Sequence, residues 1–166
     1  MTKNLLFYFS IILFCLSGFN FNYAQETDWL SGLKQYSMDV AVKQNGEITI
    51  EHHLVNLGEI SKIIDKYLPK LKLVDFINEN LPDDYCNLML SYNYFSTSSS
   101  IKKIYYGSVS VKVTRYIQCI EQKLLCYNHE IVFNIIKPTY QTVANTATEH
   151  TDTLIKDLAL LYDLQN

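Results

Sequence analysis

Residues 103–136 read KIYYGSVSVKVTRYIQCIEQKLLCYNHEIVFNII, and this stretch decides the fold. Apolar and polar residues alternate along two runs within it, which indicates two strands with one buried face each. The buried faces would carry Val109, Val111, Val113, Ile117 and Cys119 in the first run, and Leu125, Tyr127, His129, Ile131, Phe133 and Ile135 in the second. The few residues between the runs fit a hairpin turn, so we expect an antiparallel pair.

In the first of these runs, the apolar residues move from even to odd positions at Gly107. Ile104 and Tyr106 share one face, whereas the residues from Val109 onward share the other. A β-bulge at Gly107 would bring both sets to the same side of the sheet. We therefore expect a bulge there.

The register of the pair follows from matching apolar residues. The best match places Val111 opposite Phe133, so that Cys119 faces Leu125 and Cys126 points to the other face. A four-residue turn would instead place Cys119 opposite Cys126, where a disulfide could form. The sequence leaves open whether these two cysteines are oxidised.

Alternation also runs through residues 36–42, 48–54 and 86–94, which adds three strands. Gln44–Gly46 separates the first two. A two-residue loop at Asn-Gly is common in hairpins, but here it would mix apolar and polar faces. A three-residue loop pairs Val42 with Ile48, and it gives Gly46 the left-handed conformation of a bulge.

Two helices complete the predicted fold. Apolar residues between Ile60 and Ile77 recur at helical spacing, and Pro69 within them should kink or split the helix. A second helix has a capping box at Thr146–Glu149 and an apolar stripe of Leu154, Ile155, Leu158, Leu161 and Tyr162. The prediction is an α+β fold with an antiparallel sheet, in the order β-β-α-β-β-β-α, packed by a Pro-kinked helix and a long C-terminal helix.

This order of elements resembles the helix-grip layout of START-like ligand-binding domains. The resemblance implies a curved sheet closed over the last helix, with a cavity between them. We expect an apolar pocket lined by Tyr92, Tyr106, Val111, Phe133 and the Leu154–Tyr162 stripe.

Residues 1–24 have the pattern of a secretory signal peptide that is cleaved. A charged start is followed by the apolar run Leu5–Leu16 and by the small residue Ala24. The run is shorter than the ~20 residues that span a membrane, so we expect no stable membrane span after cleavage. A single domain over residues 25–166 would then be secreted or periplasmic.

Motifs for phosphate binding, zinc proteases, CxxC redox chemistry and serine hydrolases are absent from the sequence. We therefore assign no catalytic residue, no metal ligand and no cofactor, and the binding residues stay unknown. The leading hypothesis is an exported binding module for a small apolar ligand or an envelope protein partner. A structural or inhibitory protein of the envelope is an alternative.

An enzyme is the other alternative, and it rests on Asp39, Glu51 and His53. The three-residue loop would place Asp39 directly opposite Glu51, with His53 on the same face. Two close carboxylates and an imidazole could bind a divalent cation or act as an acid/base pair. A solvated polar face accounts for the same residues, because repulsion between exposed charges is weak.

Charge is unevenly distributed along the chain, whose net charge is −3. Residues 87–140 carry 6 basic and 2 acidic groups, whereas the segments on either side are acidic. Acidic helices that flank a basic sheet would balance these charges inside one fold. A basic sheet with interleaved tyrosines also suits an acidic glycan or an acidic partner surface. We expect no nucleic acid as a partner, because the protein would be exported.

Overall fold

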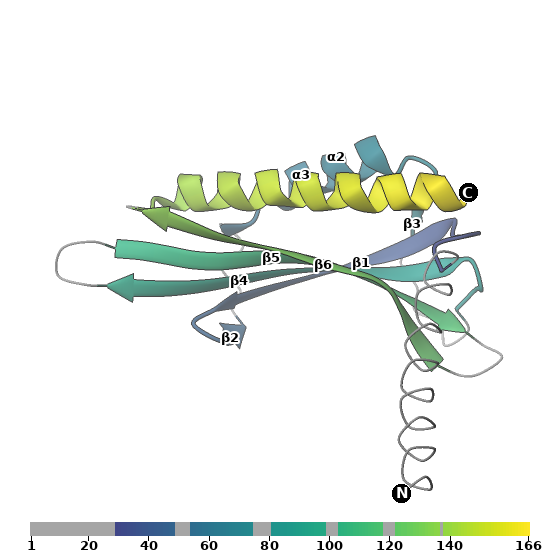
Figure 1. Ribbon diagram of the computed structural model, residues 1–166, viewed down its shortest axis with the longest axis horizontal. Helices are drawn as coiled ribbons and strands as arrows, with labels where there is room; N and C mark the ends of the chain where they lie inside the picture. Colours follow the sequence, from purple (N-terminus) through teal and green to yellow (C-terminus); the bar gives the residue numbers. More distant parts are fainter. Residues whose placement is uncertain (1–28, 49–53, 75–80, 99–102, 118–121, 137) are drawn as a thin grey trace, which may run out of the picture.

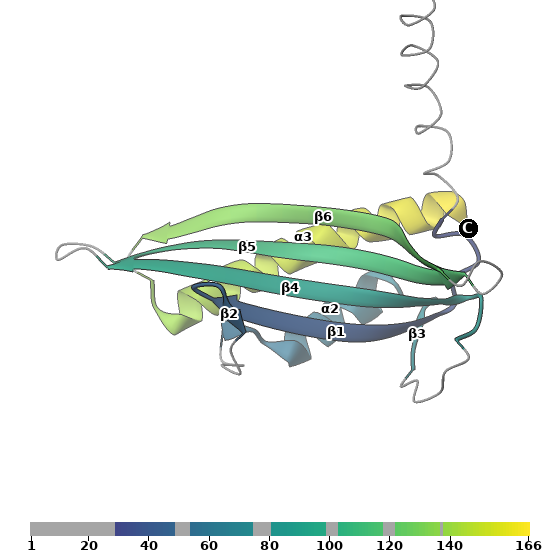
Figure 2. The ribbon, with the colours of Figure 1, turned by 90° about the horizontal axis from the view of Figure 1, so that it is seen from below.

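The computed structural model describes residues 29–48, 54–74, 81–98, 103–117, 122–136 and 138–166. The strands are β1 (Gln35–Gln44), β2 (Glu47–Ile48), β3 (Lys72–Leu73), β4 (Tyr85–Ser98), β5 (Lys103–Ile117) and β6 (Gln122–Ile136), and the helices are α2 (Leu57–Tyr67) and α3 (Tyr140–Gln165). The strands form one sheet in the order β2-β1-β4-β5-β6, with β3 beside β1. Both helices lie on the same face of this sheet (Figures 1 and 2). The predicted α+β class and the long C-terminal helix are confirmed.

The sheet is mixed rather than wholly antiparallel. β1 pairs with β4 in parallel over its full length, from Gln35 opposite Tyr85 to Gln44 opposite Tyr94. The chain between the two strands passes through α2 on the covered face, and such a crossover returns it to the start of a parallel neighbour. The alternation within each strand does not encode the direction of its partner, so the prediction of a wholly antiparallel sheet is corrected to a mixed one.

The β1–β2 hairpin has a two-residue turn, so the predicted three-residue loop is wrong. Asn45 and Gly46 have φ angles of 53° and 89°, and Lys43 lies opposite Ile48. Two consecutive positive φ angles are those of a type I′ turn, which matches the twist of the strands. Asn45 also bonds to β4: its N–H donates to the Tyr94 carbonyl over 2.7 Å, and its Oδ1 accepts from Ser96 N over 3.0 Å.

The predicted bulge at Gly107 is also wrong, because β4 and β5 pair without interruption across it. Tyr105 therefore faces the helices and is 5% exposed, whereas Tyr106 points to the other face and is 45% exposed. The irregularity lies instead between Val113 and Thr114, where β6 contributes the additional residue Cys126.

β5 and β6 are antiparallel, as predicted, but in a different register. Val111 lies opposite His129 rather than Phe133. The shift is four residues, an even number, so the residues of β6 from Tyr127 onward keep their predicted face. Leu125, which was also predicted to be buried, pairs with Thr114 before the irregularity and is 51% exposed. Cys126 is a free thiol, and Cys119 lies outside the described residues.

Pro69 ends α2 rather than kinking it. The helix closes at Tyr67, and Leu68 leaves helical geometry with φ −121° and ψ 49°. Proline disfavours the α conformation in the residue before it, and it has no N–H to continue the helix. The helix that was predicted to extend to Ile77 therefore ends at Tyr67. Lys72–Leu73 instead pairs with β1 as the strand β3.

α3 begins six residues earlier than the predicted cap. Thr139 is the N-cap and forms a capping box with Thr142. The apolar stripe is confirmed for Leu154, Ile155, Leu158 and Tyr162, which are buried, whereas Leu161 is partly exposed. None of the helices in the described ranges is long and apolar enough to cross a membrane.

Among the described residues, side chains fill the space between the sheet and α3 where the apolar pocket was predicted. Tyr92 and Val111 are fully buried, and the Tyr92 hydroxyl is hydrogen-bonded to Thr151 Oγ1 at 2.9 Å. Tyr106 points away from α3 and cannot line a space with Tyr92. The helix-grip cavity expected from the resemblance is thus occupied by the protein's own core.

Gly107 provides a test of this packing. An added Cβ would lie 2.5 Å from Cζ of Phe133, so Gly107→Ala is expected to lower the free energy of unfolding by about 2 kcal/mol through overpacking. Urea denaturation measures the change. Phe133→Leu removes the ring atoms in the way, so the double variant should lose less than the sum of the two single losses. Additive losses would contradict this packing.

Candidate functional site on the open face of the sheet

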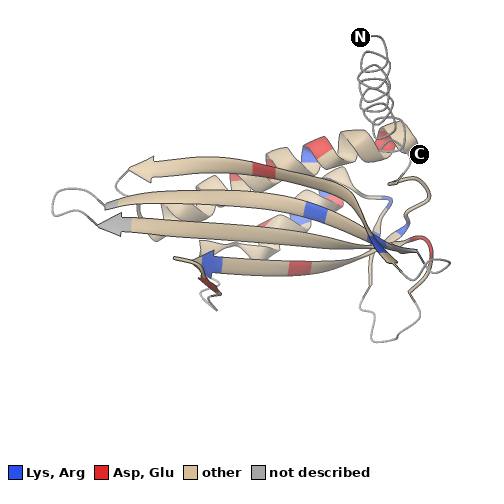
Figure 3. Cartoon of the chain, turned by 60° about the horizontal axis from the view of Figure 1, so that its bottom comes forward, with Lys and Arg blue, Asp and Glu red and all other residues tan. Residues whose placement is uncertain are grey.

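The face of the sheet opposite the helices is open to solvent among the described residues (Figure 2). Small side chains occupy its centre: Ser37 and Ala41 on β1, Ser91 on β4, and Ser108, Ser110 and Thr114 on β5. A sheet face without a covering layer is normally solvated and polar. Figure 3 shows that charged positions on this face are few and separate. A ligand would meet a shallow surface here, with charges at defined places.

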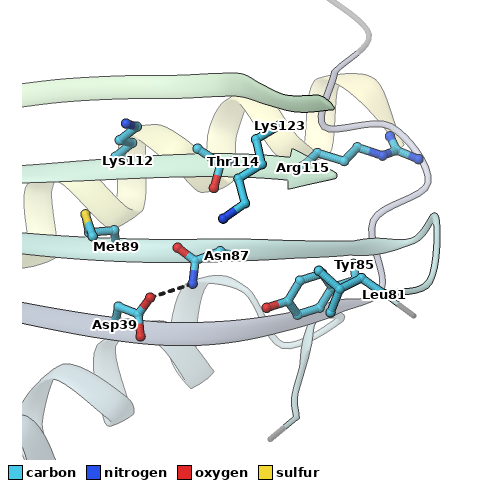
Figure 4. A pocket seen from close by; sticks show the side chains of 9 residues that line it. All are labelled: Asp39, Leu81, Tyr85, Asn87, Met89, Lys112, Thr114, Arg115 and Lys123. Carbon is cyan, nitrogen blue, oxygen red and sulfur yellow. Dashed lines mark hydrogen bonds between the residues drawn. The ribbon is translucent and has the colours of Figure 1, made fainter. Parts of the chain in front are cut away.

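A cleft of about 300 Å³ hollows one end of this face (Figure 4). Its lining consists of Asp39, Leu81, Tyr85, Asn87, Met89, Lys112, Thr114, Arg115 and Lys123. The volume is at the lower end of the range for sites that bind small molecules. The residues come from β1, β4, β5 and β6 together with Leu81, so the cleft exists only because the sheet brings these strands side by side.

A chain of hydrogen bonds holds one side of the cleft in place. Asn87 Nδ2 donates to Asp39 Oδ2 over 2.8 Å and to Ser37 Oγ over 3.0 Å. The Ser37 hydroxyl is in turn hydrogen-bonded to the Tyr85 hydroxyl at 2.5 Å. The Asp39 carboxylate is therefore oriented before any ligand arrives, and its acceptor capacity is not exhausted by a single donor.

Two lysines dominate the other side. Lys112 and Lys123 are exposed, and neither forms an ion pair within the part of the chain that the structure describes. Figure 4 shows Lys123 reaching from β6 across β5 toward Asn87. Figure 4 shows the Lys112 ammonium group turned toward β6, away from Asp39. Asp39 supplies the one carboxylate of the lining, so the cleft has an excess of positive charge.

Arg115 has a structural role. Its Nε donates to the Asp83 carbonyl and its Nη1 to the Ser31 carbonyl, both over 2.9 Å. The guanidinium thus joins two loops at the end of the sheet. Two of its five N–H groups are thus bonded to backbone carbonyls, and Lys112 and Lys123 are the two lysines of the lining.

Of the three residues in the predicted enzyme site, the structure describes only Asp39. Glu51 and His53 lie outside the described residues. The register that would have placed Asp39 opposite Glu51 is not that of the hairpin, because the turn has two residues. Asp39 pairs instead with Met89 across β1 and β4 and bonds to Asn87. No group of three metal-ligating side chains occurs among the described residues.

Sequence reasoning missed Asn87, Lys112 and Lys123. The only signal was the basic character of residues 87–140. Alternation placed Asn87 and Lys112 on a polar face, but it could not bring them to Asp39 without the parallel β1–β4 pairing. Lys123 lies on the same face because of the irregularity in the β5–β6 pairing between Val113 and Thr114.

The opposite end of the open face carries a patch of large apolar side chains, Phe95, Tyr106, Val132 and Ile136, which are 45–75% exposed. Phe95 and Tyr106 are a direct cross-strand pair, and the other two lie on β6. Apolar groups at this exposure are common singly on protein surfaces, but their clustering is typical of contact surfaces.

No family model matches the sequence, and no curated protein matches it either. The chain does show distant structural similarity to lipoproteins. A minor lipoprotein from Acinetobacter baumannii has a TM-score of 0.35 and 11% identity, over 80% of this chain and 92% of that one. The rare lipoprotein B from Shewanella oneidensis has a TM-score of 0.34 and 12% identity, over 78% and 91%.

PelC from Paraburkholderia phytofirmans, whose structure is a dodecamer, has a TM-score of 0.43 and 6% identity, over 76% of this chain and 89% of that one. Likeness at this level carries no conclusion about what this chain binds or how it assembles.

Proposed function

We propose that this protein is an exported binding module that takes an anionic ligand in the cleft on the open face of its sheet. The observation that carries the proposal is the pair of exposed lysines, Lys112 and Lys123, beside the hydrogen-bonded Asp39–Asn87 pair. Export rests on the signal-peptide pattern of residues 1–24, which lie outside the described residues.

The geometry favours a surface ligand over the small apolar ligand expected from the sequence. An enclosed apolar site would need space beneath the sheet, and fully buried side chains such as Leu90 and Tyr92 occupy that space. The cleft instead presents two cations in a chain whose net charge is −3. Local excess charge of this kind attracts an anion despite the overall charge of the protein, and it loses strength as salt is added.

A titration with acetate, an anion with a single carboxylate, tests the proposal. The backbone amide signals of Lys112, Thr114 and Lys123 should shift in a saturable way in the wild type, measured by 1H–15N NMR. The double variant Lys112→Gln/Lys123→Gln should lose most of this response, and 0.5 M NaCl should suppress it in the wild type.

Lys43→Gln is the matched control, because Lys43 lies on the same face outside the cleft and its loss changes the net charge by one. It should leave the titration unchanged. A wild type that does not saturate, or a double variant that responds like the wild type, would overturn the proposed function.

A further inference from the structure

The two charged sides of the cleft stand at a defined separation. Asp39 pairs with Met89, and Met89 pairs with Lys112, so these three residues form one row across β1, β4 and β5. Neighbouring strands lie about 4.8 Å apart, which places the Asp39 and Lys112 backbones about 10 Å apart. The two side chains do not form an ion pair with each other. A ligand lying across the row therefore meets a cation at one end and a carboxylate at the other.

The middle of the cleft accepts hydrogen bonds. Asn87 turns its amide nitrogen toward Asp39, and its carbonyl oxygen faces the side of Thr114 and Lys123 (Figure 4). The next row across the sheet thus offers an amide acceptor and the Thr114 hydroxyl. Met89 lies in the first row and presents an apolar surface between the two charges. Across the cleft, the groups follow the order cation, hydrogen-bond acceptor and carboxylate. The apolar surface is that of Met89.

We propose that the ligand is a sugar acid: a molecule with several hydroxyl groups and one carboxylate. This inference rests on the proposed function and assigns a substrate class to the same cleft. The carboxylate binds at Lys112 and Lys123, and hydroxyl groups donate to Asn87 Oδ1 and to the Asp39 carboxylate.

The Asp39 carboxylate discriminates against other anions. An acidic peptide or a simple dicarboxylate would bring a second negative charge to Asp39, and like charges brought together there oppose binding. A hydroxyl group, in contrast, donates to a carboxylate and forms a charge-assisted hydrogen bond. A neutral sugar satisfies Asp39 and Asn87 but leaves the two lysines without an anion.

Three probes of similar size separate these cases: glucuronate, glucose and glutarate. NMR titrations of the full mature chain should give the highest affinity for glucuronate. Glutarate should bind about tenfold more weakly, because it lacks the hydroxyl donors, and glucose should bind more weakly still. Asp39→Asn should weaken glucuronate about tenfold and should not weaken glutarate. Lys43→Gln should change neither.

The outcomes distinguish failure of this inference from failure of the proposed function. If glucuronate and glutarate bind equally and Asp39→Asn weakens neither, the cleft is a general anion site and the sugar-acid assignment is wrong. Tighter binding of a polyglutamate peptide than of glucuronate would likewise overturn it in favour of an acidic protein partner. If no anion shifts the cleft amides, both proposals fail.

A trimer of galacturonate distinguishes the two sources of such a ligand, a polysaccharide chain and a single sugar acid. Tighter binding of the trimer than of the monomer supports a polysaccharide chain lying along the open face. Equal affinity supports recognition of a single free or terminal sugar acid. No binding by either form of the sugar acid would contradict the inference.

Discussion

Shortening Leu154 to alanine is expected to lower the free energy of unfolding by about 3 kcal/mol. Leu154 lies in the middle of α3, is 0% exposed and belongs to the core cluster between the sheet and the helices. Removing a leucine side chain from such a site loses its transfer free energy and leaves a cavity that the neighbours fill only in part. The measurement is chemical denaturation followed by circular dichroism and by the fluorescence of the single tryptophan, Trp29.

Leu164→Ala is the matched control. It makes the same chemical change on the same helix at a position that is 82% exposed, so its effect should stay within about 0.5 kcal/mol. Equal losses for the two variants would show that α3 does not pack on the sheet through the face that carries Leu154.

Raising the pH above 9 is expected to destabilise the protein through Cys86. Burial raises the pKa of this thiol from 9.0 to about 12, with the nearby Cys126 adding to the shift and Arg115 opposing it. Between these two values the unfolded chain releases the proton, whereas the folded chain retains it. The stabilisation is therefore complete below pH 9 and is lost as the pH rises toward 12. The expected loss through this one group is about 3 kcal/mol by pH 11.

Comparison of the wild type with Cys86→Ala under reducing conditions isolates this group. The stability of the variant should fall less steeply between pH 9 and 11, so the two curves converge. Buried tyrosines such as Tyr92 and Tyr94, whose pKa burial also raises, are present in both proteins and cancel in the comparison. Cys126→Ala, which removes a half-buried thiol, should flatten the curve less. Parallel curves for wild type and Cys86→Ala would refute the assignment.

The faces of the strands could be predicted because alternation depends only on the strand itself. Val109, Val111 and Val113 point to the helices whatever strand lies beside them, and the structure buries all three. The register could not be predicted in the same way. Apolar matching paired Val111 with Phe133, whereas the structure pairs it with His129, because a shift of four residues preserves both buried faces.

The β1–β2 turn shows the limit of reasoning from a hairpin alone. Within the hairpin, a three-residue loop gave the better apolar match. The observed two-residue turn places Asn45 where it bonds to both Tyr94 and Ser96 of β4. These partners are about fifty residues away in the sequence, so their contribution is invisible until the parallel β1–β4 pairing is known.

The candidate site depends on long-range structure even more strongly. The sequence predicts that Asp39 lies beside Glu51 and His53, but its observed partner is Asn87, on a strand that follows α2 in the chain. The basic character of residues 87–140 was visible in the sequence and pointed to an acidic ligand. The position of these basic residues beside Asp39 was not visible in the sequence.

The sequence by itself determined the α+β class, the buried face along most of each long strand and the buried side of the C-terminal helix. These properties follow from periodicity, because the geometry of a strand or a helix sets which residues share a face. Tertiary structure alone decided the direction of β1 relative to β4, the register of β6 and the pairing of Lys72–Leu73 with β1 as β3. Each of these depends on free-energy differences between alternative contacts far apart in the chain, and the cleft that joins Asp39, Asn87 and Lys123 exists only once they have been settled.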